Sequence, residues 1–217
     1  MLLAIDFDGT LTDHDTIDWI AAHYAPDTFD RVDAAFSRGD LTVNECTVQQ
    51  MAPITASEQD LIRFVLATVS PRPGLRELVD YCAGHGIEPV VVSAGFDNLI
   101  TPFLQAHGVD LPVLAHTAEF TPDGIRVRFR ERAQCDVCGE ACKRAEVRAL
   151  AEGRPFGFVG DGASDLCAAE VAELRFARHV LAAHLTREGL SYLPFEDLHD
   201  VRRGLLAATG VGGSRDG

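Results

Sequence analysis

The sequence predicts an α/β protein with a doubly wound parallel sheet and a helical cap inserted after the first strand. Short apolar segments alternate with segments of helical periodicity over most of the chain, as strands and crossover helices do in a parallel sheet. The exception is the stretch 13–72, where helical periodicity continues without a strand pattern. With 217 residues, 47% of them hydrophobic, the chain can bury a sizeable core.

The first strand and the cap are predicted from the N-terminal third. The run 2–7 alternates too little for an exposed strand and is expected to be buried on both faces. Helical spacing then places Ile17, Ile20 and Tyr24 on one face, and it ends at SPRPG, whose prolines and glycine interrupt a helix. These limits predict a core of residues 1–12 and 73–210, a cap of residues 13–72 and a flexible tail at 211–217.

The remaining elements complete the sheet. A β-branched run that ends at Ser93 indicates a buried strand, and the Asp-Gly within FTPDGIRVRF indicates a hairpin. The apolar run FGFVG predicts the strand after it. The elements expected after the cap are helices near 74–84, 96–107, 142–152 and 164–171, and strands at 88–93, 112–116, 156–160 and 174–177.

Composition narrows the function. Acidic residues outnumber basic ones by 33 to 19, and the net charge of −14 argues against nucleic acid or an anionic membrane as a partner. An anionic ligand would therefore need a positive group, which a divalent metal supplies. No apolar run approaches the length of a membrane span and no signal-peptide pattern is seen, so a cytoplasmic location is expected. The sequence leaves the oligomeric state open.

Two aspartates follow the first strand. Asp6 and Asp8 would face the same side if the strand continued through them. A turn at Gly9 would put them at the carboxyl end of the strand, where open α/β sheets bind ligands. Adjacent carboxylates repel each other and tend to share a proton or bind a cation. A lone pair of this kind is more often only a turn with aspartate at its favoured positions.

A second strand supplies further carboxylates. Asp161 follows FGFVG, and Asp165 lies four residues later, where a helix is expected to begin. Asp165 alone would be explained as a helix N-cap or first-turn acid. Two strands that bring aspartates to the same sheet edge favour a metal site instead, and clustered carboxylate oxygens suit Mg²⁺.

Ser93 and Lys143 are candidates for binding an anion. The Ser93 hydroxyl and the amides after it, at the start of the next helix, could hold a phosphate, although a simple N-cap is the alternative. A lysine is by default a surface residue. Lys143, however, opens a helix just ahead of the Gly-Asp strand, where it could bind an anion and offset the carboxylates.

Taken in order, DFDGT, VVSAG, Lys143 and GDGASD resemble the four motifs of the haloacid dehalogenase superfamily of phosphohydrolases, over about residues 2–206. The insertion between the first and second motifs resembles the subgroup that contains phosphoserine phosphatases. The resemblance implies a Mg²⁺-dependent phosphomonoesterase whose partner is a small phosphorylated metabolite.

The resemblance also implies a role for each motif. Asp6 would attack phosphorus and form an aspartyl-phosphate, while Asp8 would protonate the leaving alcohol and then activate water. Mg²⁺ would be held by the Asp6 carboxylate, the Asp8 backbone carbonyl and Asp161, with Asp165 in support. The residues expected around the phosphoryl oxygens are Thr10, Ser93, Gly95 and Lys143.

The substrate is expected to be recognised by the cap, where two departures count against phosphoserine. Phosphoserine phosphatases carry a glutamate nine residues after the nucleophile, whereas this chain has Asp15, a possible substrate-recognition residue. Their cap arginine is matched by Gln50 in TVQQMAPI. The stretches DFDGTLTDHDTI, CDVCGEACK and FARHVLAAHLTREGLSYLPFEDLHDVR more closely resemble methionine-salvage phosphatases that act on 2-hydroxy-3-keto-5-methylthiopentenyl-1-phosphate.

Other activities remain as alternatives. A phosphoserine phosphatase, or a phosphotransferase or mutase, would use the same site. A non-catalytic protein of this fold would be expected to lack Asp6, Asp8 or Asp161, and all three are present. A dehalogenase is a weaker interpretation, because its chemistry needs neither the second aspartate nor the metal.

Some residues have two interpretations. Cys135, Cys138 and Cys142 are spaced C-x2-C-x3-C, which suits either three reduced thiols that merely pack or a structural zinc with a fourth ligand. His116 and Asp136 are the candidates for that ligand. The residues interpreted as surface or packing side chains rather than substrate contacts are His14, His23, Trp19 and Phe36.

Overall fold

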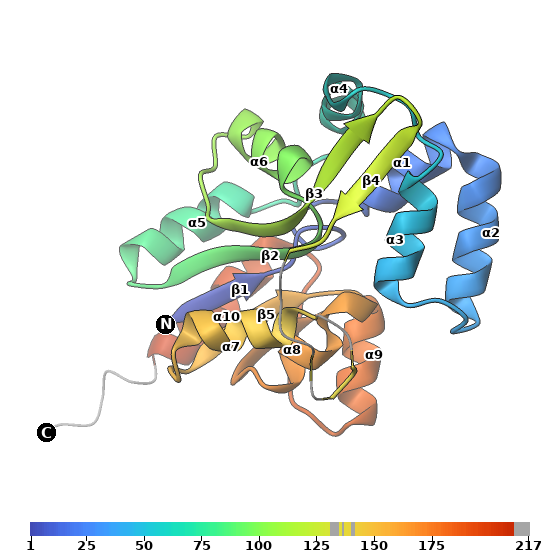
Figure 1. Cartoon of the computed structure of the whole chain (residues 1–217). Coiled ribbons are helices and arrows are strands. Elements are labelled where there is room, and N and C mark those ends of the chain that lie inside the picture. Colours follow the sequence, from blue (N-terminus) through green and yellow to red (C-terminus); the bar gives the residue numbers. More distant parts are fainter. Residues whose placement is uncertain (131–134, 136, 140–141, 211–217) are drawn as a thin grey trace, which may run out of the picture.

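The computed structural model describes residues 1–130, 135, 137–139 and 142–210, and within these it has one seven-stranded sheet. The strand order is β4-β3-β2-β1-β5-β6-β7, and every neighbouring pair is parallel except β3 and β4. The predicted α/β fold with a doubly wound parallel sheet is confirmed (Figure 1). The strands are β1 (Leu2–Ile5), β2 (Glu88–Phe96), β3 (Val113–Thr121), β4 (Gly124–Arg128), β5 (Phe156–Gly160), β6 (Leu174–Ala177) and β7 (Leu193–Pro194).

Four helices separate β1 from the rest of the sheet, all within the predicted cap 13–72, whose standing as a domain stays a prediction. They are α1 (Thr16–Tyr24), α2 (Pro26–Ser37), α3 (Val43–Met51) and α4 (Glu58–Thr68). Figure 1 shows α1, α2 and α3 gathered at the end of the sheet towards which β1 points. The other helical segments are α5 (Leu75–Gly84), α6 (Asp97–Ala106), α7 (Lys143–Ala151), the 3-10 helix η1 (Ala163–Asp165), α8 (Leu166–Glu170), α9 (His179–Arg187) and α10 (Leu198–Gly210).

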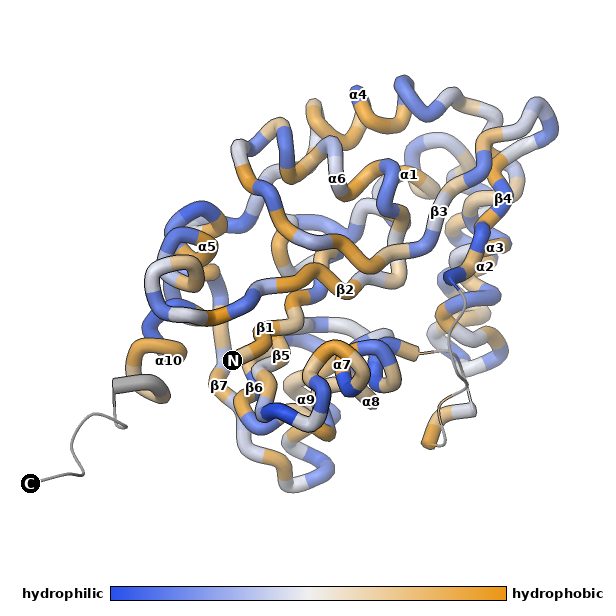
Figure 2. The backbone as a smooth tube through the Cα atoms, turned by 60° about the vertical axis from the view of Figure 1, so that its left-hand side comes forward, coloured by the Kyte–Doolittle hydropathy of each residue, from blue (hydrophilic) through white to orange (hydrophobic). Residues whose placement is uncertain are grey.

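The period of two in β1 divides the core between the faces of the sheet. Leu3 and Ile5 belong to a buried cluster shared with α5, α6 and α10, while Leu2 and Ala4 belong to a second cluster shared with α7, α8 and α9. All four side chains are buried, so β1 is apolar throughout, as Figure 2 shows by its orange tube. A strand covered on both faces holds its carboxyl end in a fixed position.

The hairpin predicted at Asp-Gly is β3–β4, paired up to Thr121 opposite Gly124. Gly124 has a φ of 137°, and a Cβ there would lie 1.8 Å from the carbonyl oxygen of Ala52. Only glycine fits such a position. The turn of the hairpin therefore approaches the end of α3 closely, which braces the cap against the sheet.

Two local predictions differ from the structure. The strand predicted at 2–7 ends at Ile5, and the carbonyl oxygen of Phe7 accepts hydrogen bonds from the amides of the following turn, from Thr10 to Thr12. Ser93 is not a helix N-cap, and it does not stand at the start of a helix, since β2 continues to Phe96 and α6 begins only at Asp97. The predicted tail at 211–217 lies outside the described residues.

The two ends of the cap are held together by Arg72, which is only 8% exposed. Its guanidinium donates to the carbonyl oxygens of Gly9 at 2.6 Å, Thr10 at 2.8 Å and Thr12 at 2.8 Å. It also donates to that of Glu196 at 3.1 Å. One buried side chain thus satisfies four carbonyl groups in the turn after Asp8 and near the C-terminal helix.

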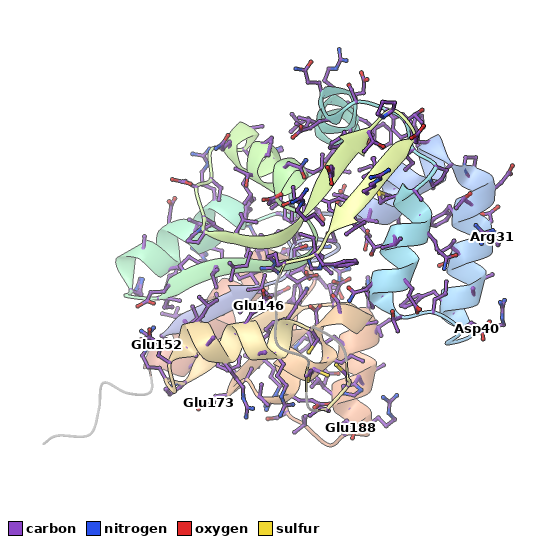
Figure 3. All side chains as sticks on the ribbon, in the orientation of Figure 1. Arg31, Asp40, Glu146, Glu152, Glu173 and Glu188 are labelled. Carbon is purple, nitrogen blue, oxygen red and sulfur yellow. The ribbon has the colours of Figure 1, made fainter. Side chains whose placement is uncertain are left out.

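The surface is rich in charge. Figure 3 shows charged side chains on the outside of the protein. Arg31 and Asp40 lie on the predicted cap, and Glu152, Glu173 and Glu188 lie on the rest of the chain. Among the described residues, no helix is long and apolar enough to cross a membrane.

Replacing Arg72 by alanine should lower the free energy of unfolding by about 2–4 kcal/mol, because buried carbonyl groups lose a charged donor. Urea unfolding followed by circular dichroism measures the change. Arg63→Ala is the matched control, since that side chain is 75% exposed and its loss should cost less than about 0.5 kcal/mol. Equal stability of the two variants would contradict the role given to Arg72.

Candidate active site

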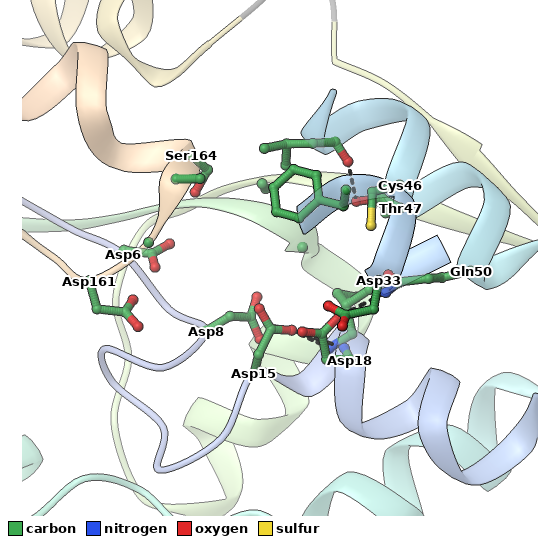
Figure 4. A pocket seen from close by; sticks show the side chains of 17 residues that line it. Asp6, Asp8, Asp15, Asp18, Asp33, Cys46, Thr47, Gln50, Asp161 and Ser164 are labelled. Atoms are coloured by element: carbon green, nitrogen blue, oxygen red, sulfur yellow. Dashed lines mark hydrogen bonds between the residues drawn. The ribbon is translucent and has the colours of Figure 1, made fainter. Parts of the chain in front are cut away.

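A cavity of about 190 Å³ lies where β1, β2 and β5 end, beneath the cap helices (Figure 4). Asp6 and Asp8 enter it from the turn after β1, Gly95 from β2, and Asp161 from the residue after β5. Figure 4 shows Asp6, Asp8 and Asp161 around one space. The structure thus brings together the aspartates that the sequence placed at the ends of separate strands.

Lys143 lies directly behind these carboxylates. Its side chain is 1% exposed, and its ammonium pairs with Oδ1 of Asp6 and with Oδ1 of Asp165, the latter at 2.7 Å. Lys143 is the first residue of α7, so the helix fixes the start of the side chain. The predicted pairing of Lys143 with the carboxylates is present in the structure, and its contact with a phosphate stays a prediction.

Neighbouring charges shift the pKa values of Lys143 and Asp6. Burial alone lowers the pKa of Lys143, but the charges of Asp165 and Asp6 outweigh it and raise that pKa, so the ammonium stays protonated. Burial raises the pKa of Asp6 well above its usual value, Asp165 raises it further, and Lys143 opposes both. Additional positive charge beside Asp6 would favour its ionised form.

Asp165 is fully buried and holds the site from behind. Its Oδ2 accepts hydrogen bonds from the backbone amides of Asp161 at 3.0 Å and Gly162 at 3.1 Å, while Oδ1 pairs with Lys143. Burial and the charge of Asp165 raise the pKa of Asp161 to about 6. The contacts of Asp165 therefore orient both Lys143 and the loop that carries Asp161.

The Asp8 carboxylate is held by different partners. Its Oδ1 accepts from the amide of Thr16 at 2.9 Å and from the Thr16 hydroxyl, and its Oδ2 accepts from the Ser93 hydroxyl at 3.3 Å. Burial raises the pKa of Asp8, although the hydrogen bonds from Thr16 and Ser93 and the charge of Lys143 oppose this. Asp8 is thus set apart from the lysine-bound pair and is tied to the first residue of the cap helix α1.

The residues predicted around a phosphate differ in whether they reach the cavity. Gly95 lines the cavity, and its amide donates to the Ser93 hydroxyl at 2.8 Å. Ser93 and Thr10 are fully buried beneath the surface, and the Thr10 hydroxyl donates to Oδ1 of Asp161 at 3.0 Å. Both hydroxyls therefore orient carboxylates in this structure, and their contact with a phosphate stays a prediction.

The cap closes the other side of the cavity with polar residues. Asp15 caps α1 by accepting from the amides of Ile17 and Asp18, and it also lines the cavity. Gln50 donates to Oδ1 of Asp18 at 2.9 Å, and Asp33 completes this acidic side. The described residues that line the cavity include no lysine, arginine or histidine.

Apolar residues of the cap complete the lining. Phe36 borders this cavity and an adjoining one of about 300 Å³, so its interpretation as cap packing alone is wrong. Ile17, Val43 and Cys46 lie near it on the cavity wall. Trp19 instead stacks on His14, with ring centroids 4.3 Å apart, and neither residue lines the cavity.

Sequence reasoning missed Thr16 and Arg72. Thr16 contacts Asp8 across eight residues of irregular chain, and no periodic pattern reports such a contact. Arg72 follows the cap and reaches back to the turn after Asp8. The position of Arg72 between two prolines, in the segment that ends the helical pattern, is the one available signal.

Comparison with known proteins agrees with this geometry. Residues 3–170 match the model of the haloacid dehalogenase-like hydrolase family. A 2-hydroxy-3-keto-5-methylthiopentenyl-1-phosphate phosphatase of Bacillus cereus is 31% identical over 212 residues, which cover 95% of this chain and 96% of the relative.

Solved structures show the same fold at lower identity. A phospho-aspartyl intermediate analogue of phosphoserine phosphatase superposes with a TM-score of 0.68 and 21% identity, over 93% of this chain and 97% of that one. Phosphoserine phosphatase from T. onnurineus gives a TM-score of 0.69 and 20% identity, over 92% and 91% of the two chains. With the family match and the curated relatives, these findings confirm the predicted enzyme class: the chain belongs to the haloacid dehalogenase-like hydrolase family, as a hydrolase of the phosphatase type.

Proposed function

We propose that this chain is a Mg²⁺-dependent phosphomonoesterase that forms an aspartyl-phosphate on Asp6, and that its substrate is 2-hydroxy-3-keto-5-methylthiopentenyl-1-phosphate. The observation that carries the proposal is the arrangement of Asp6. Its carboxylate reaches the cavity, is fixed from behind by buried Lys143, and has Asp8 and Asp161 beside it. A nucleophile and a separate acid thus face one small space, with a cation directly behind the nucleophile.

The residues present suit a magnesium ion. Asp6, Asp161 and Asp165 offer carboxylate oxygens that lie within 4.8 Å of one another, and Mg²⁺ prefers oxygen ligands. Asp6, the Asp8 backbone carbonyl and Asp161 would hold the ion, while Asp165, occupied by Lys143 and two amides, supports them. When bound, Mg²⁺ would neutralise charge on the phosphoryl group and favour ionised Asp6.

The first step is transfer of the phosphoryl group to the protein. Asp6 forms a bond to phosphorus as the bond from phosphorus to the substrate oxygen breaks, and Asp8 gives its proton to that oxygen. The raised pKa of Asp8 helps it to carry this proton. Lys143, fixed on Asp6, offsets negative charge on the transferring group.

The second step reverses the role of Asp8. Its carboxylate accepts a proton from water, the water oxygen bonds to phosphorus, and the bond from phosphorus to Asp6 breaks. Inorganic phosphate leaves, and both aspartates return to their starting states. Asp8 is held by Thr16 and Ser93, whereas Asp6 is paired with Lys143, so the proton carrier and the nucleophile have different partners.

The chemistry of the cavity supports the choice of substrate. Phosphoserine carries a carboxylate, which would meet Asp15, Asp18 and Asp33 without a basic residue in the described lining. The proposed substrate has hydroxyl, keto and methylthio groups and no charge beyond its phosphate. Its thioether end suits the apolar wall around Phe36 and Cys46.

Two other activities use the same machinery. Phosphoserine phosphatase activity is favoured by the likeness in fold and by carboxylates that could bind the amino group of serine. A phosphotransferase or mutase would pass the phosphoryl group to a second substrate instead of water. Release of inorganic phosphate from a single phosphomonoester separates a hydrolase from the second alternative.

Asp6→Asn should lower phosphate release by about 10³-fold or more, because the amide is a poor nucleophile. Asp8→Asn should slow hydrolysis of the intermediate, so ³²P-labelled p-nitrophenyl phosphate should label this variant and leave Asp6→Asn unlabelled. Asp30→Asn, on the exposed side of α2, is the control and should behave as wild type. Labelling of Asp6→Asn would exclude Asp6 as the phosphorylated residue.

The wild-type enzyme should turn over 2-hydroxy-3-keto-5-methylthiopentenyl-1-phosphate with a higher kcat/KM than phosphoserine, because phosphoserine brings a second anion into an acidic cavity. Measuring phosphate release from both substrates with Mg²⁺ present tests the choice. A higher kcat/KM for phosphoserine would reject this substrate but would leave the phosphatase mechanism intact.

Gln50→Arg should raise kcat/KM for phosphoserine by about 10-fold, because it supplies a charged hydrogen-bond donor where the described lining has none. Gln49→Arg is the matched control, since it makes the same charge change at a residue outside the lining. If both variants changed phosphoserine turnover equally, Gln50 would have no part in selecting the substrate.

A further inference from the structure

Four cysteines form a second cluster of metal-binding side chains. The sulfur atoms of Cys135, Cys138, Cys142 and Cys167 all lie within 4.8 Å of one another. Three of them come from the segment between β4 and α7, and the fourth comes from α8. The two cysteines outside the cluster lie in other helices: Cys46 is in α3 and Cys82 is in α5.

Among the described residues, a fourth cysteine rather than His116 joins the cluster. His116 lies outside the cluster, and its Nδ1 accepts from the amide of Arg130 at 3.2 Å. Asp136 lies outside the described residues. Cys167, which is 25 residues beyond Cys142 and was not connected to it by any spacing motif, occupies the fourth place.

We infer that Cys135, Cys138, Cys142 and Cys167 bind one structural zinc ion. In a tetrahedral Zn–thiolate site with bonds of about 2.3 Å, neighbouring sulfur atoms are about 3.8 Å apart, a separation that the observed cluster accommodates. Four sulfur ligands select zinc over magnesium, whose ligands are oxygen atoms. The site is therefore chemically distinct from the carboxylates of the cavity.

Backbone amides hold the Cys135 sulfur in place. The amide of Gly139 donates to the carbonyl oxygen of Cys135 at 3.0 Å, and Gly139 has a φ of 74°, a conformation that favours glycine. The amide of Val137 donates to the Cys135 sulfur at 3.5 Å, and that of Cys138 donates to it as well. Hydrogen bonds of this kind orient a ligand atom from outside the metal site.

Exposure and location suit a structural role. Cys135 is buried, Cys142 and Cys167 are half-buried, and Cys138 is exposed, which gives an ion a route to the site. The cluster borders the adjoining cavity of about 300 Å³ that also contains Lys143 in its wall. Zinc would thus close the loop before α7 against α8 at the edge of the cavity.

Such a link would act on the two residues that support Asp6, a consequence that rests on the proposed function. Cys142 directly precedes Lys143, and Cys167 lies two residues after Asp165. The ammonium of Lys143 and the carboxylate of Asp165 are 2.7 Å apart, so zinc would fasten together the two segments that supply this pair. Bound zinc then positions Lys143 and takes no direct part in the reaction.

Elemental analysis of the full chain, expressed in zinc-supplemented medium and purified without chelators, tests the site. About one zinc per chain is expected in the wild type and in Cys82→Ala, a matched control whose cysteine lies outside the cluster. Cys167→Ser should lose most of the metal. Cys138→Ser removes an exposed ligand with little effect on packing and should lose it too, which guards against misfolding of the first variant.

Cobalt substitution reads the ligand set directly and does not depend on turnover. Co²⁺ added to zinc-free protein should produce sulfur-to-cobalt charge-transfer absorption in the wild type and Cys82→Ala, and weaker absorption in Cys167→Ser. Zinc-free wild-type protein without this absorption would overturn the inference, as would a disulfide between any two of the four cysteines in freshly purified protein. Both readouts stay valid even if the proposed phosphatase substrate is wrong.

Discussion

The buried ammonium of Lys143 between Asp6 and Asp165 is the interaction on which the site depends. Two carboxylates this close cannot both remain charged in a dry interior without a cation, and removing the cation would leave them unpaired. The geometry of the pair requires α7 to begin at Lys143 and the loop after β5 to return Asp165 to the same point. One ammonium group therefore links three segments that are distant in sequence: the end of β1, the start of α7 and the loop after β5.

This arrangement also places one positive charge among the buried carboxylates of an acidic protein. Part of the net charge of −14 lies within the site itself, where six aspartates line the cavity, and Lys143 is fixed directly behind Asp6. Asp8 is kept apart by Thr16 and Ser93, so that the carboxylates have separate partners. In the proposed mechanism, different environments for similar side chains would allow one aspartate to attack while another transfers a proton.

The sequence predicted the features that follow from local pattern. Apolar runs located the strands, and aspartates directly after two of them identified the edge of the sheet where the carboxylates gather. Contacts between segments could not be predicted in the same way. Thr16 on Asp8 and Cys167 beside Cys142 depend on how loops return in space, and neither leaves a spacing signal.

The strand limits show why boundaries are harder to predict than elements. The apolar run predicted a strand at 2–7, yet β1 ends at Ile5, and the carbonyl oxygen of Phe7 accepts hydrogen bonds from the amides of the turn that follows. The turn brings both Asp6 and Asp8 to the cavity. Apolar periodicity reports burial and not hydrogen-bond partners, so it identified the right edge of the sheet but not the last residue of the strand.

The way the chain enters and leaves the stretch α1–α4 has a consequence for how such proteins diversify. Thr12 pairs with Pro71, the amide of Asp13 donates to Ser70 at 3.0 Å, and Arg72 fastens both ends to the turn after Asp8. An inserted segment of another length could begin and end at the same two points, because residues 12–13 and 70–71 lie side by side. Evolution could therefore exchange everything between them, and with it the recognised metabolite, while the catalytic scaffold stays as it is.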